Sequence, residues 1–343
     1  MNRILREDAE SILQQDISWS KLKDARILVT GAGGMLGSCI ARTLQLLSET
    51  KNMDIEVYGL VRNPDRLPGD IKPGLKIIRQ SVTEPIETDT AFDYIVHAAS
   101  PASPKIMKDD PVGTIAANTL GTFYTLELAR KSNAKGYIFI SSREIYGQPY
   151  EGQTEFTEDT YGFVDPLSPR SCYPEGKRAA ETMCASFAKQ YGMRIRIARL
   201  AHTYGPGMSV DDGRVQADFL RDVINRRDIV LKSEGKPLRT YTYISDAAAA
   251  IFRILLDSDE MVYNISSPES TVTIRQLAET LVRAYPDRKL KLAFDIPESG
   301  TDSGTAPFTL GILNSDKLRS IGWHPVYSLE EGLKRTVDYL EGR

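Results

Sequence analysis

Tyr173 and Lys177 form the residue pair whose types and spacing point most directly to chemistry. They lie four residues apart at the predicted start of a helix, which places both side chains on one helix face, one turn apart. A lysine cation in this position favours the phenolate, so we expect it to lower the tyrosine pKa from its usual value of about 10. Such a tyrosine can accept a proton from a hydroxyl group while a hydride leaves the same carbon. The pair by itself is weak evidence, because this spacing also arises by chance.

A glycine-rich turn near the N-terminus adds a second signal. Gly31, Gly34 and Gly37 directly follow a β-rich run and precede a helical pattern. In this arrangement the first glycine permits a tight turn, the second lets the backbone approach a pyrophosphate, and the third lets helix and strand pack closely. Met35 and Leu36 lie at the helix N-terminus, which would receive the negative charge. The turn predicts dinucleotide binding, against the alternative of an ordinary turn between a strand and a helix.

The end of the second predicted strand leaves the choice between NAD and NADP open. An acid at this point would bind the ribose hydroxyls of NAD, but the chain reads Gly-Leu-Val-Arg-Asn over 59–63. Arg62 could accept the 2′-phosphate of NADP, or it could be a solvated loop arginine.

The elements that must position these residues alternate between strands and helices. The predicted strands are 26–30, 55–61, 76–82, 94–100, 137–142 and 194–200, and the predicted helices include 112–131 and 173–191. Such alternation predicts an α/β fold with a doubly wound parallel sheet. Open sheets of this kind bind ligands beyond the carboxyl ends of their strands, where both Gly31 and Ser142 fall.

The organisation of the chain is that of an ordinary globular protein. It has 343 residues, 41% of them hydrophobic, and a net charge of −3, which does not favour a nucleic-acid partner. Its three cysteines are scattered without metal-ligand spacing and no apolar run is long enough for a membrane, so we expect a cytoplasmic protein without a metal. We predict a helical extension over 1–24, a dinucleotide-binding domain over 25–205, and over 206–343 mainly a smaller lobe, with some segments returning to the first domain.

As a set, the motifs resemble the extended short-chain dehydrogenase/reductase family of nucleotide-sugar enzymes, the NAD-dependent epimerases and dehydratases. The resemblance covers nearly the whole chain, from the glycine turn to the segment 322–333. Within this family the chain is most similar to the UDP-glucuronate decarboxylase branch. The segments that carry this similarity are 97–104, 118–122, 169–178 and 212–215.

The resemblance implies a reaction that begins by oxidising C4 of a nucleotide sugar, with a UDP-sugar favoured. NAD would take the hydride while Tyr173 takes the hydroxyl proton. Lys177 would hold the nicotinamide ribose, and Ser100 would also contact the cofactor. The 4-keto sugar can then lose a carboxylate, lose water or epimerise, and most members of the family return the hydride at the end.

The resemblance also implies the substrate contacts and the assembly. Arg214 and Arg239 match family positions that bind the nucleotide diphosphate, as rigid guanidinium groups suited to phosphate. Asn118 is a further expected substrate contact. Family members are commonly homodimers, which here would pair the predicted helices 112–131 and 173–189 of each subunit. The lobe over 206–343 would bind the nucleotide sugar.

The segment 141–147 is where the reactions of the family diverge. The family has serine or threonine, then serine in decarboxylases or aspartate in dehydratases, then glutamate. Ser142 fits the first position and would hydrogen-bond the reacting hydroxyl. Glu144 fits the third position, as a base at C5 or a group facing the departing carboxylate. Arg143 fits neither subfamily and speaks against standard dehydration; it could clamp a substrate carboxylate, or be held by a nearby acid.

Another departure from the family pattern is His202, which follows a strand end. It could donate to a phosphate or to a sugar hydroxyl and titrate near neutral pH, or it could be structural.

The sequence therefore predicts a nucleotide-sugar enzyme that oxidises C4 transiently with NAD(P), most similar to a UDP-glucuronate decarboxylase and hence a lyase. Three alternatives stay open: a C4 or C5 epimerase or 4,6-dehydratase, an NADPH-dependent keto-sugar reductase, and a non-catalytic regulator that binds NAD(P) or a nucleotide sugar.

Overall fold

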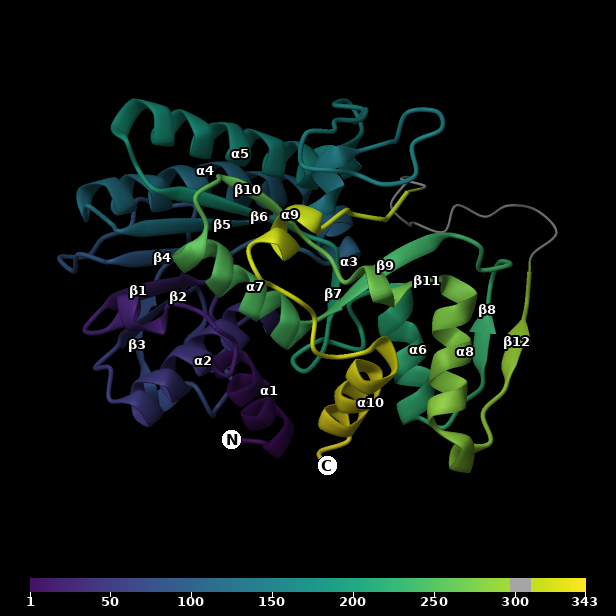
Figure 1. Cartoon of the computed structure of the whole chain (residues 1–343). Coiled ribbons are helices and arrows are strands. Elements are labelled where there is room, and N and C mark those ends of the chain that lie inside the picture. Colours follow the sequence, from purple (N-terminus) through teal and green to yellow (C-terminus); the bar gives the residue numbers. More distant parts are fainter. Residues whose placement is uncertain (297–309) are drawn as a thin grey trace.

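The structure, a computed structural model, describes residues 1–296 and 310–343 (Figure 1). Within these residues seven parallel strands form a central sheet in the order β10-β6-β5-β4-β1-β2-β3. The strands are β1 (Arg26–Thr30), β2 (Glu56–Val61), β3 (Leu75–Arg79), β4 (Tyr94–His97), β5 (Gly136–Ser142), β6 (Ile195–Leu200) and β10 (Val262–Ile265). Because β1 pairs with both β2 and β4, the strand order reverses there, at the point where doubly wound sheets bind ligands. The predicted α/β fold is confirmed.

Helices cover both faces of this sheet. Figure 1 shows α4 and α5 over one face and α1, α2 and α7 over the other. The helices of the described chain are α1 (Arg3–Leu13), α2 (Met35–Lys51), α3 (Pro104–Asp109), α4 (Pro111–Lys131), α5 (Cys172–Tyr191), α6 (Val215–Ile224), α7 (Ile244–Asp257), α8 (Ile274–Ala284), α9 (Asp316–Ser320) and α10 (Leu329–Leu340). None of them is both long and apolar enough to cross a bilayer.

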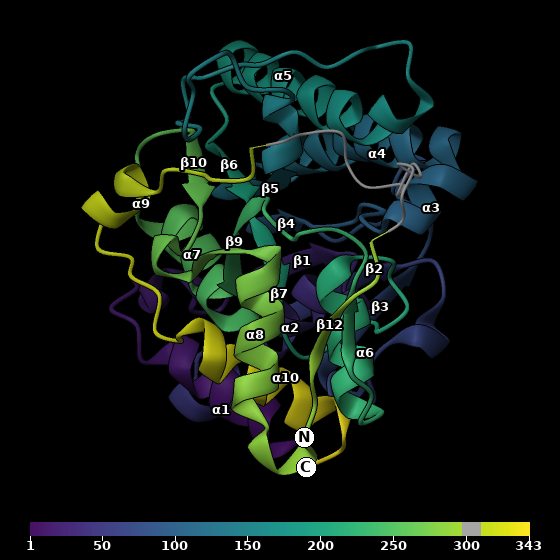
Figure 2. The ribbon, with the colours of Figure 1, turned by 90° about the vertical axis from the view of Figure 1, so that its right-hand side faces the viewer.

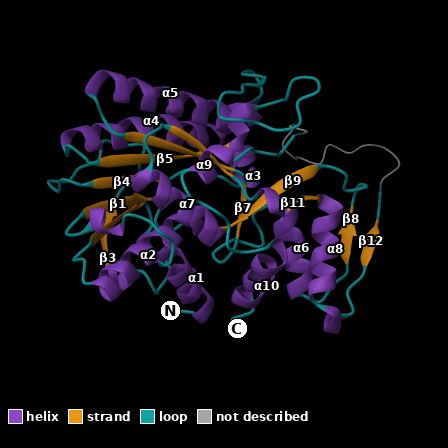
Figure 3. Cartoon of the chain, in the orientation of Figure 1, coloured by secondary structure: helices purple, strands orange, loops and turns teal. Residues whose placement is uncertain are grey.

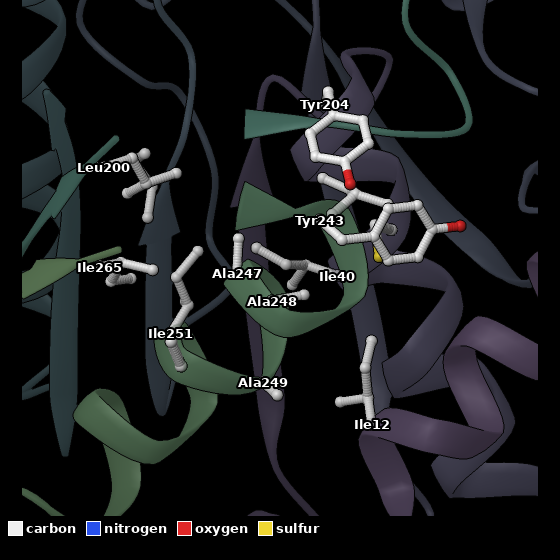
Figure 4. Packing of buried hydrophobic residues seen from close by; sticks show 14 of the residues in the cluster. Ile12, Ile40, Leu200, Tyr204, Tyr243, Ala247, Ala248, Ala249, Ile251 and Ile265 are labelled. Carbon is white, nitrogen blue, oxygen red and sulfur yellow. The ribbon is translucent and has the colours of Figure 1, made fainter. Parts of the chain in front are cut away.

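The sequence of β1 explains why the sheet is covered on both faces. Ile27 and Val29 belong to the apolar cluster that includes α2 and α7, whereas Leu28 belongs to the cluster beneath α4 and α5. Alternate side chains of a strand point to opposite faces, so an uninterrupted apolar strand needs a partner layer on each side. Figure 4 shows the first cluster, with Ile40 of α2 and Ile251 of α7 among its members.

Each strand predicted from the sequence is present, although several ends differ. The predicted strand 94–100 ends at His97, because the backbone N–H of Ala99 turns to the Thr30 hydroxyl instead of a strand neighbour. The edge strand β10 was not predicted. It has four residues, comes after the regular alternation has ended, and pairs with β6.

The rest of the chain builds two small sheets and the helices beside them (Figures 2 and 3). Strands β7 (His202–Tyr204), β9 (Leu238–Tyr243) and β11 (Thr271–Thr273) form one sheet, and β8 (Ile229–Leu231) and β12 (Leu292–Phe294) form the other. Helix α8 contacts α6, α10 and both strands of the second sheet. The predicted domain boundaries stay a prediction; β10 and α7 both follow residue 206 and pack within the large sheet layer.

The predicted N-terminal helix is tied into the fold as α1. Its apolar side chains, including Ile4 and Ile12, are buried, and α1 packs against α2 and α7. Asp8 on the same face accepts hydrogen bonds from the Tyr243 hydroxyl at 2.9 Å and from Arg335 at 2.8 Å. These contacts join the start of the chain to α10 at its end.

Candidate active site

The glycine turn after β1 has no room for side chains. Gly31 adopts φ +68°, and a Cβ on it would lie 2.9 Å from the Ala99 Cα. A Cβ on Gly37 would lie 2.2 Å from the Gly31 carbonyl oxygen. Helix α2 begins directly after Gly34, so the free N–H groups of its first turn, at Met35 and Leu36, sit at this turn. The geometry fits the pyrophosphate of a dinucleotide.

The other predicted cofactor contacts lie around the same crevice. Arg62 is exposed directly after β2, and its role toward a 2′-phosphate stays a prediction. The Ser100 hydroxyl donates to Asn118 Oδ1 at 2.8 Å, while the Asn118 amide donates to the Thr114 carbonyl. Asn118 is fully buried against α5, where a Cβ on Gly176 would lie 3.0 Å from the Asn118 Cβ. Asn118 therefore orients Ser100 in this structure, and its predicted contact with substrate stays a prediction.

The end of β5 brings the predicted catalytic side chains together. Ser142 hydrogen-bonds the hydroxyl of Tyr173, in the first turn of α5. One turn further, Lys177 donates to the Ile140 carbonyl at 2.6 Å. Its ammonium nitrogen lies 5.7 Å from the centre of the Tyr173 ring and 4.6 Å from that of Phe139. The helix spacing and the strand end thus converge as the sequence predicted.

The electrostatics of this pair differ from the prediction. Burial raises the pKa of Tyr173 to about 12, and Glu144 raises it further, while the hydrogen bond from Ser142 acts in the opposite direction. Burial also lowers the pKa of Lys177 to about 7, against the attraction of Glu181. The expectation that Lys177 holds the tyrosine pKa below 10 is therefore wrong for this structure. The loss of water around Tyr173 outweighs the hydrogen bond from Ser142 and the attraction of Arg214 and Arg170.

Glu144 lies near the catalytic pair but is already engaged. Both of its carboxylate oxygens accept from Arg170 Nη2, at 3.0 and 2.9 Å. Its backbone N–H donates to the Ser142 hydroxyl at 3.2 Å. To act as a base at C5, the carboxylate would have to share or release a bond to Arg170.

Arg143 is the most unusual charged group of the site. Its side chain is 7% exposed, and its only polar partner among the described residues is the Leu310 carbonyl, at 3.4 Å from Nη1. Burial lowers the pKa of Arg143 to about 10; Glu144 opposes this shift, and the nearby Arg239 and Arg170 add to it. Among the described residues no acid forms an ion pair with Arg143, because Glu144 pairs with Arg170 instead.

His202 lies among three arginines of the site, Arg143, Arg214 and Arg239. Burial lowers the pKa of His202 well below its usual value, and the cations of Arg143, Arg239 and Arg214 lower it further. The expectation that His202 titrates near neutral pH is therefore wrong. Its Nδ1 is buried without a partner in the described part of the chain, and the ring hydrogen-bonds the Thr240 backbone. Arg214 pairs with Asp212, and burial lowers the pKa of Arg239.

Arg170, Glu181 and Arg199 also shape the site and were not singled out from the sequence. Arg170 holds Glu144, while Glu181 accepts from Arg199 at 2.7 Å and from the Ser141 hydroxyl at 2.5 Å. For Glu181 a signal was available, because it follows Lys177 by four residues, at the same helical spacing that joins Lys177 to Tyr173.

The glycine turn follows β1, where the strand order of the parallel sheet reverses. Ser142 ends β5, two strands away, and lies beside Tyr173 and Lys177 of α5. This combination defines a class of nucleotide-dependent α/β enzymes. This chain belongs to the NAD dependent epimerase/dehydratase family, whose model matches residues 27–266. The membership confirms the predicted family, the prediction of an enzyme and NAD as the cofactor.

Named relatives lie within the same family. UDP-glucuronic acid decarboxylase 6 of Arabidopsis thaliana is 34% identical over 90% of this chain and 86% of its own length. UDP-glucuronic acid decarboxylase 1 of Danio rerio is 33% identical over 92% of this chain and 72% of its own length.

Solved structures of the family share the architecture. UDP-glucose 4-epimerase of Thermotoga maritima, solved with UDP-glucose, has a TM-score of 0.77 and 26% identity, over 92% of this chain and 98% of its own. A dTDP-glucose 4,6-dehydratase of Bacillus anthracis, solved with NAD, has a TM-score of 0.74 over 92% of this chain and 96% of its own, and at 20% identity supports the fold only.

Proposed function

We propose that this protein decarboxylates UDP-glucuronate through transient oxidation at C4 of the sugar. The named relatives support the substrate and reaction class. Within the chain, the observation that carries the proposal is Arg143, a buried cation beside Ser142 that forms no ion pair with any carboxylate of the described residues. A buried charge without a partner is costly, and a substrate carboxylate would supply the missing anion.

The catalytic residues then have separable roles. Bound NAD supplies the hydride acceptor at C4, and its positive nicotinamide ring favours the phenolate. Ser142 hydrogen-bonds the C4 hydroxyl and Tyr173 takes its proton, leaving a ketone adjacent to the carbon that bears the carboxylate. When the C5–C6 bond breaks, its electron pair moves to the C4 oxygen as CO₂ departs. The phenol of Tyr173, now protonated, donates to that oxygen; its pKa of about 12 keeps it a donor at neutral pH.

The remaining side chains would bind and orient the substrate. Arg214 and Arg239 would take the diphosphate, and Arg143 the carboxylate. His202, neutral at physiological pH with Nδ1 unpartnered, suits a sugar hydroxyl better than a phosphate, because a neutral imidazole nitrogen without a proton accepts a hydrogen bond.

We also propose that the protein is a cytoplasmic homodimer. Large apolar side chains are exposed along one face of α4: Val112, Ile115, Leu120 and Phe123. Their spacing places them within one stripe of the helix, which a second copy could cover. Cys184 of α5, in contrast, is fully buried against its own sheet and is not part of such a surface. The three cysteines are unpaired, as in a reducing compartment.

Incubation of the purified protein with UDP-glucuronate, followed by mass spectrometry and proton NMR, tests the reaction. We expect loss of CO₂ and formation of a UDP-pentose without added NAD, because the hydride is returned. An unchanged mass with altered ring couplings would establish an epimerase instead, a candidate that the Thermotoga maritima structure favours. Stoichiometric consumption of NADPH would establish a reductase. Binding of nucleotide without turnover of any sugar nucleotide would refute an enzymatic role.

A further inference from the structure

Helix α5 is joined to the end of β5 by three polar contacts at one-turn intervals. Three consecutive strand residues each contact one of three helix residues that are four positions apart. The pairs are Ser142 with Tyr173, the Ile140 carbonyl with Lys177 at 2.6 Å, and Ser141 with Glu181 at 2.5 Å. The first two contacts belong to the proposed catalytic pair, and the third has no role in the reaction as described above.

Glu181 is held firmly in place. Besides the Ser141 hydroxyl, it accepts from Arg199 Nη2 at 2.7 Å and from Arg199 Nε at 3.1 and 3.2 Å. The side chains of Glu181 and Arg199 are 11% and 4% exposed. Arg199 is itself fixed, because its Nη1 donates to the Tyr146 hydroxyl at 2.9 Å and to the Glu158 carbonyl at 2.7 Å. The position of the carboxylate is therefore set by β5 and β6 together.

The charged and titratable groups that act on Lys177 come from two elements. From β4, His97 contributes no charge, because burial lowers its pKa to about 3. On α5 itself lie Tyr173, Cys184 and Glu181; burial raises the pKa of the tyrosine and of the cysteine, so both are neutral at pH 7. Within the described part of the chain, Glu181 is thus the one carboxylate that acts on the Lys177 ammonium.

We infer that Glu181, fixed by Ser141 and Arg199, is a positioning residue that raises the protonated fraction of Lys177 at neutral pH. The inference rests on the proposed role of Lys177 in holding the nicotinamide ribose. Burial lowers the pKa of Lys177 to about 7 even with Glu181 present, and Glu181 is the largest influence in the opposite direction. Without this carboxylate, the pKa would fall further and most of Lys177 would lose its proton at pH 7. Only the ammonium form can donate to both the Ile140 carbonyl and the ribose hydroxyls while also favouring the Tyr173 phenolate.

The test is the affinity for NADH as a function of pH, because this measurement needs no sugar substrate. Titrations followed by NADH fluorescence between pH 5.5 and 9 should show wild-type affinity falling with a midpoint near pH 7, as Lys177 loses its proton. In Glu181→Gln we expect this midpoint to move down by about one pH unit, since an opposite charge one turn away shifts a pKa by that order. At pH 7 the variant should therefore bind NADH several-fold more weakly than at its own acidic plateau. Glu181→Asp, which keeps the charge, should restore most of the wild-type midpoint.

Two controls separate this role from a structural one. Glu175→Gln removes an equal charge from the same helix, where Glu175 pairs with Arg178 at the surface, and should leave the midpoint unchanged. If Glu181→Gln does not fold because Arg199 is left unpaired, Glu181→Gln/Arg199→Gln removes both charges. Arg199 does not act on Lys177 directly, so this double variant should show the same downward shift.

An unshifted midpoint in a folded Glu181 variant would overturn the inference. So would a pH dependence that persists in Lys177→Met, because the titrating group would then not be Lys177. Failure to turn over UDP-glucuronate would refute the proposed function and leave the NADH result intact, so the two failures are distinguishable.

Discussion

Replacing Arg143 with methionine tests whether this arginine is built for a ligand or for the fold. A structural arginine stabilises the protein through its hydrogen bonds, and its removal costs stability. A ligand-facing arginine that is buried without an anion destabilises the protein, because its charge has left water without compensation, and its removal should raise stability. The two cases therefore predict opposite signs for the same substitution.

The magnitude follows from the burial of the guanidinium. Its pKa falls from 12.5 to about 10, and each pKa unit is worth about 1.4 kcal/mol. Because the folded-state pKa is the lower one, the charge disfavours the folded state by up to about 3 kcal/mol at every pH below about 10. Arg143→Met removes this cost and a single weak bond to the Leu310 carbonyl. We expect a free energy of unfolding higher by up to about 3 kcal/mol, or a Tm higher by roughly 4 °C.

The assay pairs thermal unfolding of the ligand-free protein with binding of two sugar nucleotides. Affinity for UDP-glucuronate should fall by about 10-fold or more, as expected for losing a charge-assisted bidentate contact, while UDP-glucose should bind nearly as before. Arg42→Met is the matched control. Arg42 is 4% exposed, close to the 7% of Arg143, but its Nε donates to the Asp70 carboxylate at 2.6 Å, so its loss should lower stability. A destabilised Arg143→Met protein with unchanged preference between the two nucleotides would refute the reasoning.

Three further substitutions test the remaining parts of the proposal. Tyr173→Phe should lower turnover by about 10²-fold or more, because proton transfer is lost, while NADH affinity stays within a few-fold; near wild-type turnover would remove Tyr173 from its role. Gly37→Ala should abolish dinucleotide binding, because the new Cβ would lie 2.2 Å from a backbone oxygen. Gly69→Ala is the control, because a Cβ there meets open space, and this variant should bind the dinucleotide normally. Equal binding by both variants would contradict the geometry. Leu120→Lys should convert the proposed dimer to a monomer, as measured by light scattering. Val230→Lys, at a similarly exposed apolar site outside α4, should leave the dimer intact. A dimer that persists in Leu120→Lys would place the interface elsewhere.

The sequence predicted the elements that depend on local pattern. The strand 26–30 has the predicted bounds, because its apolar run ends at a glycine whose positive φ cannot continue a strand. Likewise, α4 and α5 differ from their predicted starts by one residue each. Motif spacing also placed Tyr173 and Lys177 correctly, since a four-residue separation on a helix fixes their relative position whatever surrounds them.

What the sequence could not predict depends on burial and on distant partners. Glu144 and Arg170 are 26 residues apart, and no periodicity connects a strand end to the start of the next helix. The sign of the pKa shift of Tyr173 was predicted wrongly. The spacing in the sequence shows that a lysine is near the tyrosine, but it does not show that both side chains are removed from water. That desolvation appears only in the packed structure. Asp246, in the first turn of α7, shows the same limit: its carboxylate accepts from the backbone N–H groups of Val326 and Tyr327, 80 and 81 residues further along the chain.

The electrostatics of the site link its stability to its substrate. Burial disfavours the charge on Arg143 and on Lys177, and among the described residues this desolvation is only partly compensated. A substrate carboxylate would supply the opposite charge beside Arg143. Binding of such a ligand therefore gains from neutralising this cation, beyond its own contacts, and stabilises the folded state by mass action. A sugar nucleotide without a carboxylate would leave Arg143 uncompensated, so under the proposed function the same buried charge would also favour an acidic sugar.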